Sequence, residues 1–301
     1  LDAGGSHTLE RLVTEVARDV QDPRRAVSVL ERLRARDLVD AKNSDERKEI
    51  RDRALLRIDA LGSGSDFTPF LQHAGIASLD IGYSGEAGWG AYHSAYDTFE
   101  HYVRFGDPTF EYGVTQAKTT GRIVLRLANA DTLPFETTTF ADTVARYATE
   151  VRKLADTKRA DTEERNREIR EKTLEIAADP AKPFIAPKEE EAVPHLEFAP
   201  LENAVAHLQK SARAFDAKPK DDRVLMHLEQ HLTRDEGLPD RGWYRHQVYA
   251  PGFYTGYGVK TLPAIREAIE QRKWSEANAQ IAIVAKVLEG YAAELDRAAN
   301  P

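Results

Sequence analysis

The apolar residues in the second half of the chain recur at helical spacing, and this periodicity constrains the fold more than any other feature of the sequence. One such series is Phe140, Val144, Tyr147 and Val151. Residues three or four positions apart lie on the same side of an α-helix. A charged segment at 158–172 continues this helix into solvent. We therefore expect the chain beyond about residue 130 to be almost entirely helical.

A proline-rich linker interrupts this helical half, with prolines at positions 180, 183, 187, 194 and 200. Prolines at this density prevent a continuous helix. Beyond the linker, helices are expected at about 201–212, 262–272 and 275–297. The last of them carries one apolar stripe, formed by Ile281, Val284, Leu288 and Tyr291. The stripe favours the core of a helical bundle, with a subunit interface as the alternative.

The first half has a different pattern. Residues 6–20 show helical spacing, whereas residues 31–57 are dense in charge and predict an exposed, irregular or weakly helical segment. A turn-rich loop at 61–66 precedes a short helix closed by Gly75, and a strand is expected at 76–81. Loop, helix and strand in that order indicate part of an α/β unit, in which functional loops lie at strand ends.

Asp107 and Pro108 predict the start of another helix, which runs to about Asn129. Aspartate is a favoured N-cap residue, and proline is favoured at the first helical position.

Composition excludes several classes of protein. The 301 residues carry a formal net charge of -8, which argues against nucleic acid or an anionic membrane as the main partner, since both require a concentrated basic surface. No cysteine is present, so disulfides, cysteine-based metal sites and a thiol nucleophile are excluded. This absence fits both the cytosol and a periplasmic location. The chain begins at Leu1 rather than at methionine, which we interpret as a truncation or a processing point.

Among the nine histidines, His93 is the candidate for chemistry, because it follows a glycine-rich stretch and is flanked by Tyr92 and Tyr96. On spacing alone, a structural histidine is favoured, since catalytic zinc needs three or more protein ligands. His227 and His231 are four positions apart, but without an HExxH arrangement a surface pair is favoured. The sequence contains neither a serine nucleophile elbow nor a phosphate-binding loop.

Several segments of the chain, taken together, resemble one family. They are 61–67, 75–78, 92–98, 133–135, 237–241 and 244–251, which read LGSGSDF, GIAS, YHSAYDT, LPF, GLPDR and YRHQVYAP. In this order they are similar to the zinc peptidases that include glutamate carboxypeptidase II and, as a non-enzymatic relative, the transferrin receptor. The resemblance covers the chain from about Ser6 to the C-terminus.

The resemblance implies a co-catalytic site with two zinc ions, in which His93 is the last metal ligand. In such sites the metals lower the pKa of a bridging water, which attacks the peptide carbonyl. Tyr92 would donate its hydroxyl to the developing oxyanion. Gly64 and Ser65 would hold the substrate backbone, and Tyr257 would enter the substrate pocket from the helical domain.

The family's other metal ligands and its general-base glutamate precede the segment that matches Ser6. The 301 residues are therefore expected to be inactive alone, and to expose a core surface that the missing N-terminal half of the peptidase domain covers. Specificity is also expected to differ. The family member that cleaves acidic peptides has cationic residues at the positions of Asp80, Gly82 and Gly256. A preference for neutral substrates, or a broader one, is therefore expected here. Ser65 replaces an asparagine, and both side chains can bond a substrate.

The resemblance also divides the chain. Residues 1–130 would form the C-terminal part of the peptidase domain, an α/β/α fold, and residues 131–301 an all-helical dimerisation domain that pairs two subunits. It favours a periplasmic or extracellular location. The leading hypothesis is an exopeptidase acting on small peptides. The alternatives are a catalytically inactive receptor or binding ectodomain, and a free-standing dimerisation module.

Overall fold

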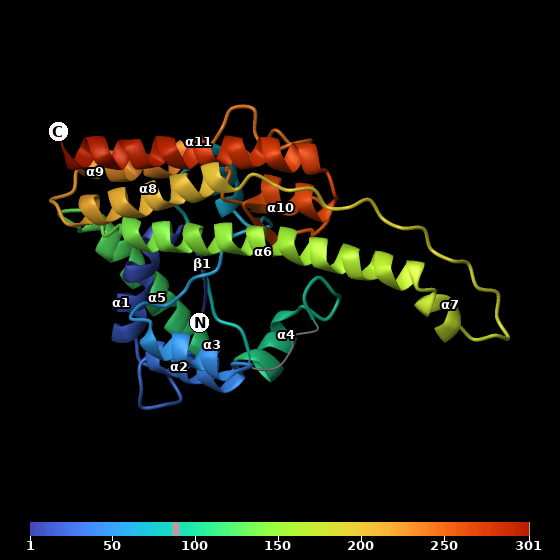
Figure 1. The fold of residues 1–301 in the computed structure, drawn as a ribbon. Helices are drawn as coiled ribbons and strands as arrows, with labels where there is room; N and C mark the ends of the chain where they lie inside the picture. Colours follow the sequence, from blue (N-terminus) through green and yellow to red (C-terminus); the bar gives the residue numbers. More distant parts are fainter. Residues whose placement is uncertain (86–90, 301) are drawn as a thin grey trace.

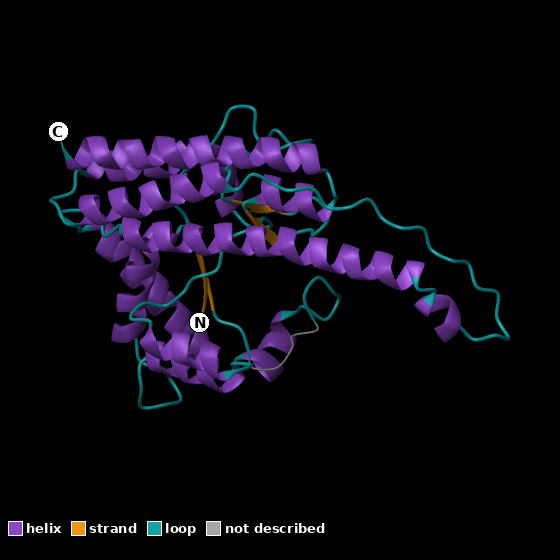
Figure 2. Cartoon of the chain, viewed as in Figure 1, coloured by secondary structure: helices purple, strands orange, loops and turns teal. Residues whose placement is uncertain are grey.

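Three long helices dominate the molecule. The computed structural model describes residues 1–85 and 91–300. In it α6 (Thr137–Arg170), α8 (Ala199–Asp216) and α11 (Trp274–Ala299) lie side by side, and α10 (Pro263–Glu270) packs against one end of α11 (Figure 1). Figure 2 shows that helix prevails and that strands are confined to two short ribbons. The expected helical second half is confirmed.

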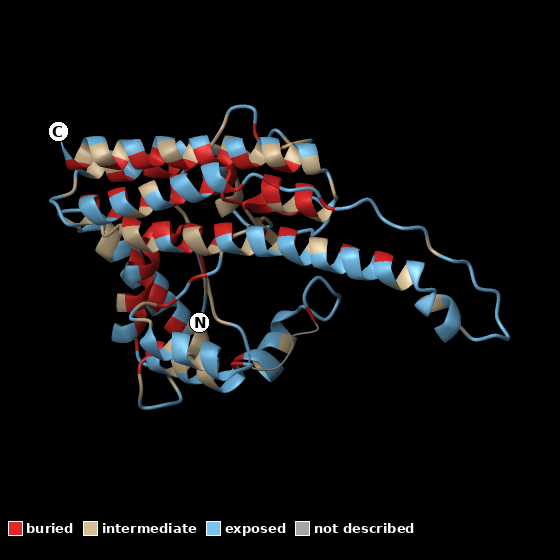
Figure 3. Ribbon diagram, viewed as in Figure 1, coloured by how far each residue is buried: buried red, intermediate tan, exposed pale blue. Residues whose placement is uncertain are grey.

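The bundle core is built from the stripes that the sequence predicts. Phe140, Val144 and Val151 of α6 are fully buried, and the stripe of α11 from Ile281 to Tyr291 is at most 1% exposed. Figure 3 shows buried residues on the sides of the three helices that face one another. The α11 stripe is therefore bundle core within a single chain, and each buried large side chain contributes about 1.5–3 kcal/mol.

The second half also contains smaller elements. They are α7 (Thr173–Ala177), α9 (Asp222–His227), a 3₁₀ turn η4 (Leu228–Leu232), and a ribbon of β3 (Tyr249–Pro251) and β4 (Val259–Thr261). The C-terminal part of α6 extends past the bundle, and the linker returns along it (Figure 1). Asn166 holds this return, because its amide accepts from Glu190 N (2.9 Å) and donates to Glu190 O (2.8 Å).

The first part of the chain is organised around one short antiparallel ribbon. Strand β1 (Asp2–Gly5) pairs with β2 (Leu79–Gly82), and Gly4 also bridges Asp59 in parallel. The 3₁₀ turn η1 (His7–Leu9) and α1 (Glu10–Asp19) follow β1, and α1 packs against α5 (Glu111–Ala128). The expected strand is present, beginning three residues later than predicted. The described residues contain no larger sheet, so the α/β/α fold stays an expectation.

The charged segment at 31–57 is more regular than predicted. It forms α2 (Val29–Asp40) and α3 (Ser44–Asp52). Ser28 Oγ accepts from Glu31 N at 3.2 Å while Glu31 Oε2 accepts from Ser28 N at 2.8 Å, a capping box. Asn43 Oδ1 accepts from Glu46 N at 2.9 Å. These caps satisfy N–H groups that a helix start leaves unpaired, and they stabilise helices that bury little apolar surface.

The prediction that a helix begins at Asp107 and Pro108 is wrong. Helix α5 begins at Glu111, because Phe110 has a left-handed backbone with φ 57° and separates it from Pro108. Asp107 still binds the helix start, since its Oδ2 accepts from Gly113 N at 2.9 Å. Before it lie α4 (Phe99–His101) and the π-helical turn η3 (Tyr102–Gly106); another π-helical turn, η2 (Pro69–Ala74), ends at Gly75 with φ 63° as expected.

A buried polar network joins the two parts of the chain. His7 Nδ1 lies 3.2 Å from Glu10 Oε1, and His7 Nε2 lies 2.8 Å from the hydroxyl of Tyr147 on α6. Arg53 Nη2 donates to Glu10 Oε2 at 2.8 Å. His7 and Glu10 are fully buried, so each needs these partners to offset its lost hydration.

In the described part of the chain, we find no helix with the length and apolar character needed to cross a bilayer.

Removing the Tyr147 hydroxyl is expected to destabilise the protein. Burial raises the pKa of Tyr147 to about 12, so the hydroxyl stays neutral and bonded to His7. Tyr147→Phe leaves a buried ring nitrogen without its partner, which costs about 1–3 kcal/mol. Urea unfolding measures the loss. Tyr254→Phe is the control, because Tyr254 is 81% exposed, and a change within about 0.5 kcal/mol is expected there. Equal stability of Tyr147→Phe and wild type would contradict the network.

A second prediction concerns pH. His207 on α8 lies between Glu289 Oε2 (2.6 Å) and Asp296 Oδ2 (2.8 Å) of α11, and hydrogen bonds to these carboxylates raise the pKa of His207. A raised folded pKa gives stabilisation that is complete below the unfolded value of about 6.5 and is lost as pH rises through the folded value.

The difference in unfolding free energy between wild type and His207→Gln should therefore be larger at about pH 5.5 than at about pH 9. His195→Gln is the control for the exchange itself, because it removes an exposed histidine that lies in the linker. A His207 difference that is flat or grows with pH would rule out the charged bridge.

Candidate substrate and metal site

Two loops from different parts of the chain meet at the predicted substrate site. The first holds Gly62–Ser65, and the second, at 252–258, joins β3 to β4 and holds Tyr257. Ser63 N donates to Tyr257 O at 3.1 Å. A Cβ added at Gly62 would lie 1.9 Å from that same oxygen, and one at Gly64 would lie 2.7 Å from the Tyr257 ring. Only glycine permits this approach, and Gly64 also has φ 104°.

The second loop is held by a partly buried ion pair between Arg241 and Glu267. Arg241 bonds both Glu267 and the carbonyl of Pro251, and Glu267 Oε1 accepts from Phe253 N at 2.7 Å. Gly252 N also donates to Gly258 O at 2.9 Å, which closes the loop on itself. The Tyr257 side chain stays 58% exposed, so its ring is positioned by backbone and remains open to a ligand.

The first loop is held at both ends. Gln72, fully buried in η2, donates from Nε2 to the carbonyls of Leu61 and Gly62 at 2.8 and 2.9 Å. At the other end the carbonyl of Ser65 accepts from Thr68 N at 3.0 Å. Ser65 itself is exposed. The structure thus brings Gly64 and Tyr257 into contact with Ser65 next to them; their substrate-binding roles stay predictions.

Tyr92 and His93 lie on an exposed segment. The two rings stack with centroids 3.8 Å apart and planes at 21°, and His93 has a left-handed φ of 56°. The backbone bonds described here are local, such as Ser94 N to Ala91 O at 3.0 Å. The end of the preceding glycine-rich stretch, residues 86–90, lies outside the described residues.

The described residues do not make up a zinc site. Among them, no three histidine, aspartate or glutamate side chains gather in a way that could hold a metal ion. The exposed imidazole of His93 fits a single ligand position, whereas catalytic zinc needs at least three protein ligands. The role of His93 as a ligand and of Tyr92 as a catalytic donor therefore stay predictions, and the other ligands would have to come from outside the described residues.

The ribbon near the first loop is acidic. Asp80 on β2 is exposed and pairs in register with Gly4, and Gly82 pairs with Asp2, which is also exposed. The sequence does not mark Asp2 as part of this acidic ribbon, because only the strand register shows that it pairs with Gly82. The two carboxylates add negative charge to this ribbon, and the disfavouring of an acidic substrate stays an expectation.

Sequence reasoning also missed the Arg241–Glu267 pair. Arg241 is the last residue of the segment 237–241, which carries part of the family resemblance, and only this position in the segment could have marked it as a candidate. Its partner is 26 positions away on α10, and no spacing rule joins a loop residue to a helix at that distance.

Comparisons with known proteins identify relatives of this chain. Residues 196–296 match the transferrin receptor-like dimerisation domain. A probable glutamate carboxypeptidase from Arabidopsis thaliana is 32% identical over 216 residues, which cover 70% of this chain and 27% of that protein. The aminopeptidase NAALADL1 of Mus musculus is 27% identical over 253 residues, 79% of this chain and 31% of that protein.

The chain belongs to the transferrin receptor-like peptidase family. A probable glutamate carboxypeptidase from Arthroderma benhamiae is likewise 32% identical, over 223 residues, 71% of this chain and 27% of that protein. The matched dimerisation domain contains α8, α10 and α11 of this family member. The chain spans about a quarter to a third of the length of the relatives named here.

A glycine exchange tests whether the two loops must touch. Gly64→Ala forces a Cβ onto the Tyr257 ring at a left-handed backbone position, which costs about 1–3 kcal/mol. Gly82→Ala is the matched control, since a Cβ there meets nothing within 4 Å. Thermal unfolding should show a lower midpoint for Gly64→Ala than for the control. Equal midpoints would mean that the loops separate without cost.

Proposed function

We propose that the protein containing these 301 residues is a co-catalytic zinc exopeptidase that hydrolyses small peptides. The observation that carries the proposal is the similarity, over 70–79% of the chain, to relatives named as carboxypeptidases and aminopeptidases. In this proposal the chain supplies the C-terminal part of the peptidase domain, and the remaining metal ligands and the general base lie outside it.

Each candidate residue has one task in this proposal. Bound zinc would supply a water of lowered pKa and a polarised carbonyl. His93 would offer one imidazole ligand from an exposed segment, and Tyr92, whose ring stacks on it, would donate its hydroxyl to the oxyanion. The contact between Gly64 and Tyr257 supports a substrate-binding role, because it leaves Ser65 and the Tyr257 ring exposed side by side.

The substrate preference follows from charge. Asp2 and Asp80 are exposed on one ribbon, and Gly256 offers no cation near Tyr257. We therefore propose faster cleavage of neutral dipeptides than of peptides ending in glutamate. Relatives carry both carboxypeptidase and aminopeptidase names, and the proposal includes removal of a residue from either end.

A homodimer and a second candidate function rest on the dimerisation domain. The match over residues 196–296 supports pairing of two copies through the helical half. It also favours an alternative, a receptor-like or binding ectodomain without catalysis, because a dimerisation domain needs no metal. For both functions we propose a periplasmic or extracellular location.

Zinc content separates the two candidates. The full-length protein, purified without chelators, should contain about two zinc ions per chain. His93→Ala should lower that content and reduce peptidase activity by at least about 100-fold. His195→Ala is the control, since His195 is exposed in the linker, and it should change neither. A well-folded dimer without zinc would favour the receptor-like alternative. Unchanged zinc and activity in His93→Ala would remove His93 from the site.

A further inference from the structure

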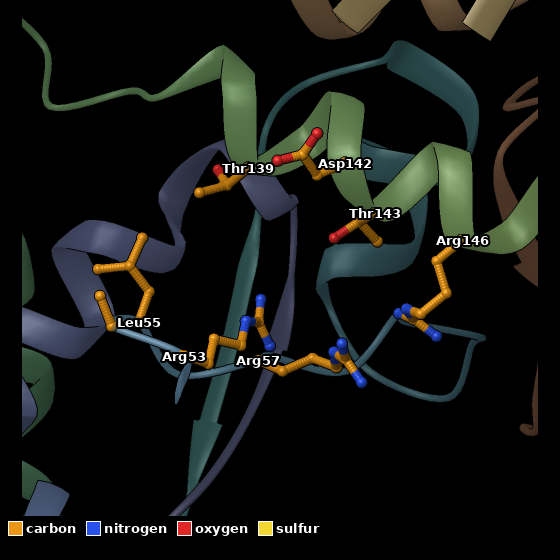
Figure 4. Close-up of a pocket in the computed structure, with 8 residues that line it drawn as sticks. Arg53, Leu55, Arg57, Thr139, Asp142, Thr143 and Arg146 are labelled. Atoms are coloured by element: carbon orange, nitrogen blue, oxygen red, sulfur yellow. The ribbon is translucent and has the colours of Figure 1, made fainter. Parts of the chain in front are cut away.

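A pocket lies where the segment after α3 passes beneath the first turns of α6. It has a volume of about 220 Å³ and is shown in Figure 4. One wall consists of residues 53–55 and 57, and the other of residues 139, 142, 143 and 146 of α6. None of the residues assigned to the substrate or metal site lines it.

Three guanidinium groups line this pocket, those of Arg53, Arg57 and Arg146. Figure 4 shows all three on the same side of it, with the ends of Arg57 and Arg146 turned toward one another. The two walls are joined only through the tertiary fold, so the fold itself brings three positive charges together. Each of the three also pairs with one glutamate, so a bound anion would be held by the donors that these pairs leave unused.

Each arginine keeps unused donors. Arg146 bonds Glu150 through Nη1 at 2.7 Å and lies over the Tyr147 ring, 4.6 Å from its centroid. Arg57 bonds Glu49 through one nitrogen, and Arg53 bonds Glu10 through Nη2. A guanidinium carries five N–H groups. Arg53 Nη1 is buried and has no hydrogen-bond partner. Burial lowers the pKa of Arg53; the paired carboxylate of Glu10 opposes this lowering, and the charges of Arg57 and Arg146 add to it.

Asp142, the acidic side chain that lines the pocket, has partners outside the arginine cluster. Asp142 accepts from Gln209 Nε2 at 2.8 Å and lies 3.7 Å from Arg213. Figure 4 shows its carboxylate directed away from the three guanidiniums. The Thr143 side chain comes from the same wall of the pocket and adds a hydroxyl.

From this arrangement we propose that the pocket is a binding site for a small oxyanion, a phosphate or a carboxylate group, held by Arg57 and Arg146 with Arg53 beside them. Guanidinium forks match the planar or tetrahedral oxygens of such anions. The pocket volume of about 220 Å³ is several times the roughly 30 Å³ that one water molecule occupies, so a small oxyanion can be accommodated. The site is separate from the proposed peptidase chemistry and stands or falls without it.

Calorimetric titration of the 301-residue chain tests the site. Inorganic phosphate and N-acetylglycine are the two probes, titrated separately at constant ionic strength. Saturable binding of one or both is expected, with a dissociation constant below about 10 mM. Tighter binding of phosphate would identify a phosphate site, and tighter binding of N-acetylglycine a site for a chain-terminal carboxylate. Absence of heat from both probes up to that concentration would overturn the proposal.

Variants show whether the pocket is responsible. Arg57→Gln with Arg146→Gln should raise the dissociation constant at least about tenfold, since each charge-assisted bond contributes that much. The control is Arg165→Gln with Arg167→Gln, which also removes two arginines that pair with glutamates on α6, outside the pocket. If the double variant fails to fold by circular dichroism, Arg57→Gln alone is measured, because Arg57 pairs with an exposed glutamate. Equal affinity in variant and control would refute the assignment.

Discussion

The arrangement of the two parts of the chain, the β1–β2 ribbon and the helical bundle, depends on the hydrogen bonds of the buried His7 imidazole. It follows directly after β1, and its two ring nitrogens reach Glu10 on one side and Tyr147 of α6 on the other. An isolated histidine or glutamate in that position would lose its hydration without compensation. Together they form a chain of partners, and the ribbon of β1 and β2 is thereby fixed relative to the bundle.

Glu10 extends this effect to the segment after α3. It accepts from Arg53 and, more weakly, from Ile58 N at 3.3 Å. The same carboxylate therefore orders the strand-like residues that border β1 and one wall of the arginine pocket. Because no member of the network can be removed without leaving a buried polar group unpaired, the junction between the two parts is specified by hydrogen bonds as well as by apolar packing.

Sequence patterns predicted the elements that are held by apolar periodicity. The stripe on α11, the long α6 and the left-handed Gly75 follow from side-chain spacing and backbone freedom, which are local properties. The boundary errors lie where polar side chains decide. Caps at Ser28 and Asn43 made regular helices out of a segment without apolar periodicity, and the backbone of Phe110 delayed α5. The proposed division of the chain at about residue 130 stays a prediction, since Leu71 belongs to the hydrophobic cluster around Phe140 and Phe135 packs against the cluster around Leu12.

The candidate site was less predictable because its residues meet only through the fold. The contact between Gly64 and Tyr257 joins positions 193 apart in the chain. The Arg241–Glu267 ion pair holds the loop that carries Tyr257. The glycines of the first loop gave a local signal, whereas the supporting ion pair gave none. Local sequence patterns alone mark the first loop and His93 as candidates. Their roles came from the family resemblance.

The carbonyl of Tyr257 sits where a side chain at Gly62 would be, and this has a mechanical consequence. The loop that holds Gly62 is also tied to the helical half, because Gln72 donates to the carbonyls of Leu61 and Gly62 and its backbone carbonyl accepts from Arg245 N and His246 N. A side chain at position 62 would therefore have to displace backbone that is held from two directions. The spacing between the two loops is thus fixed at the level of backbone atoms, independently of what the exposed Tyr257 ring does.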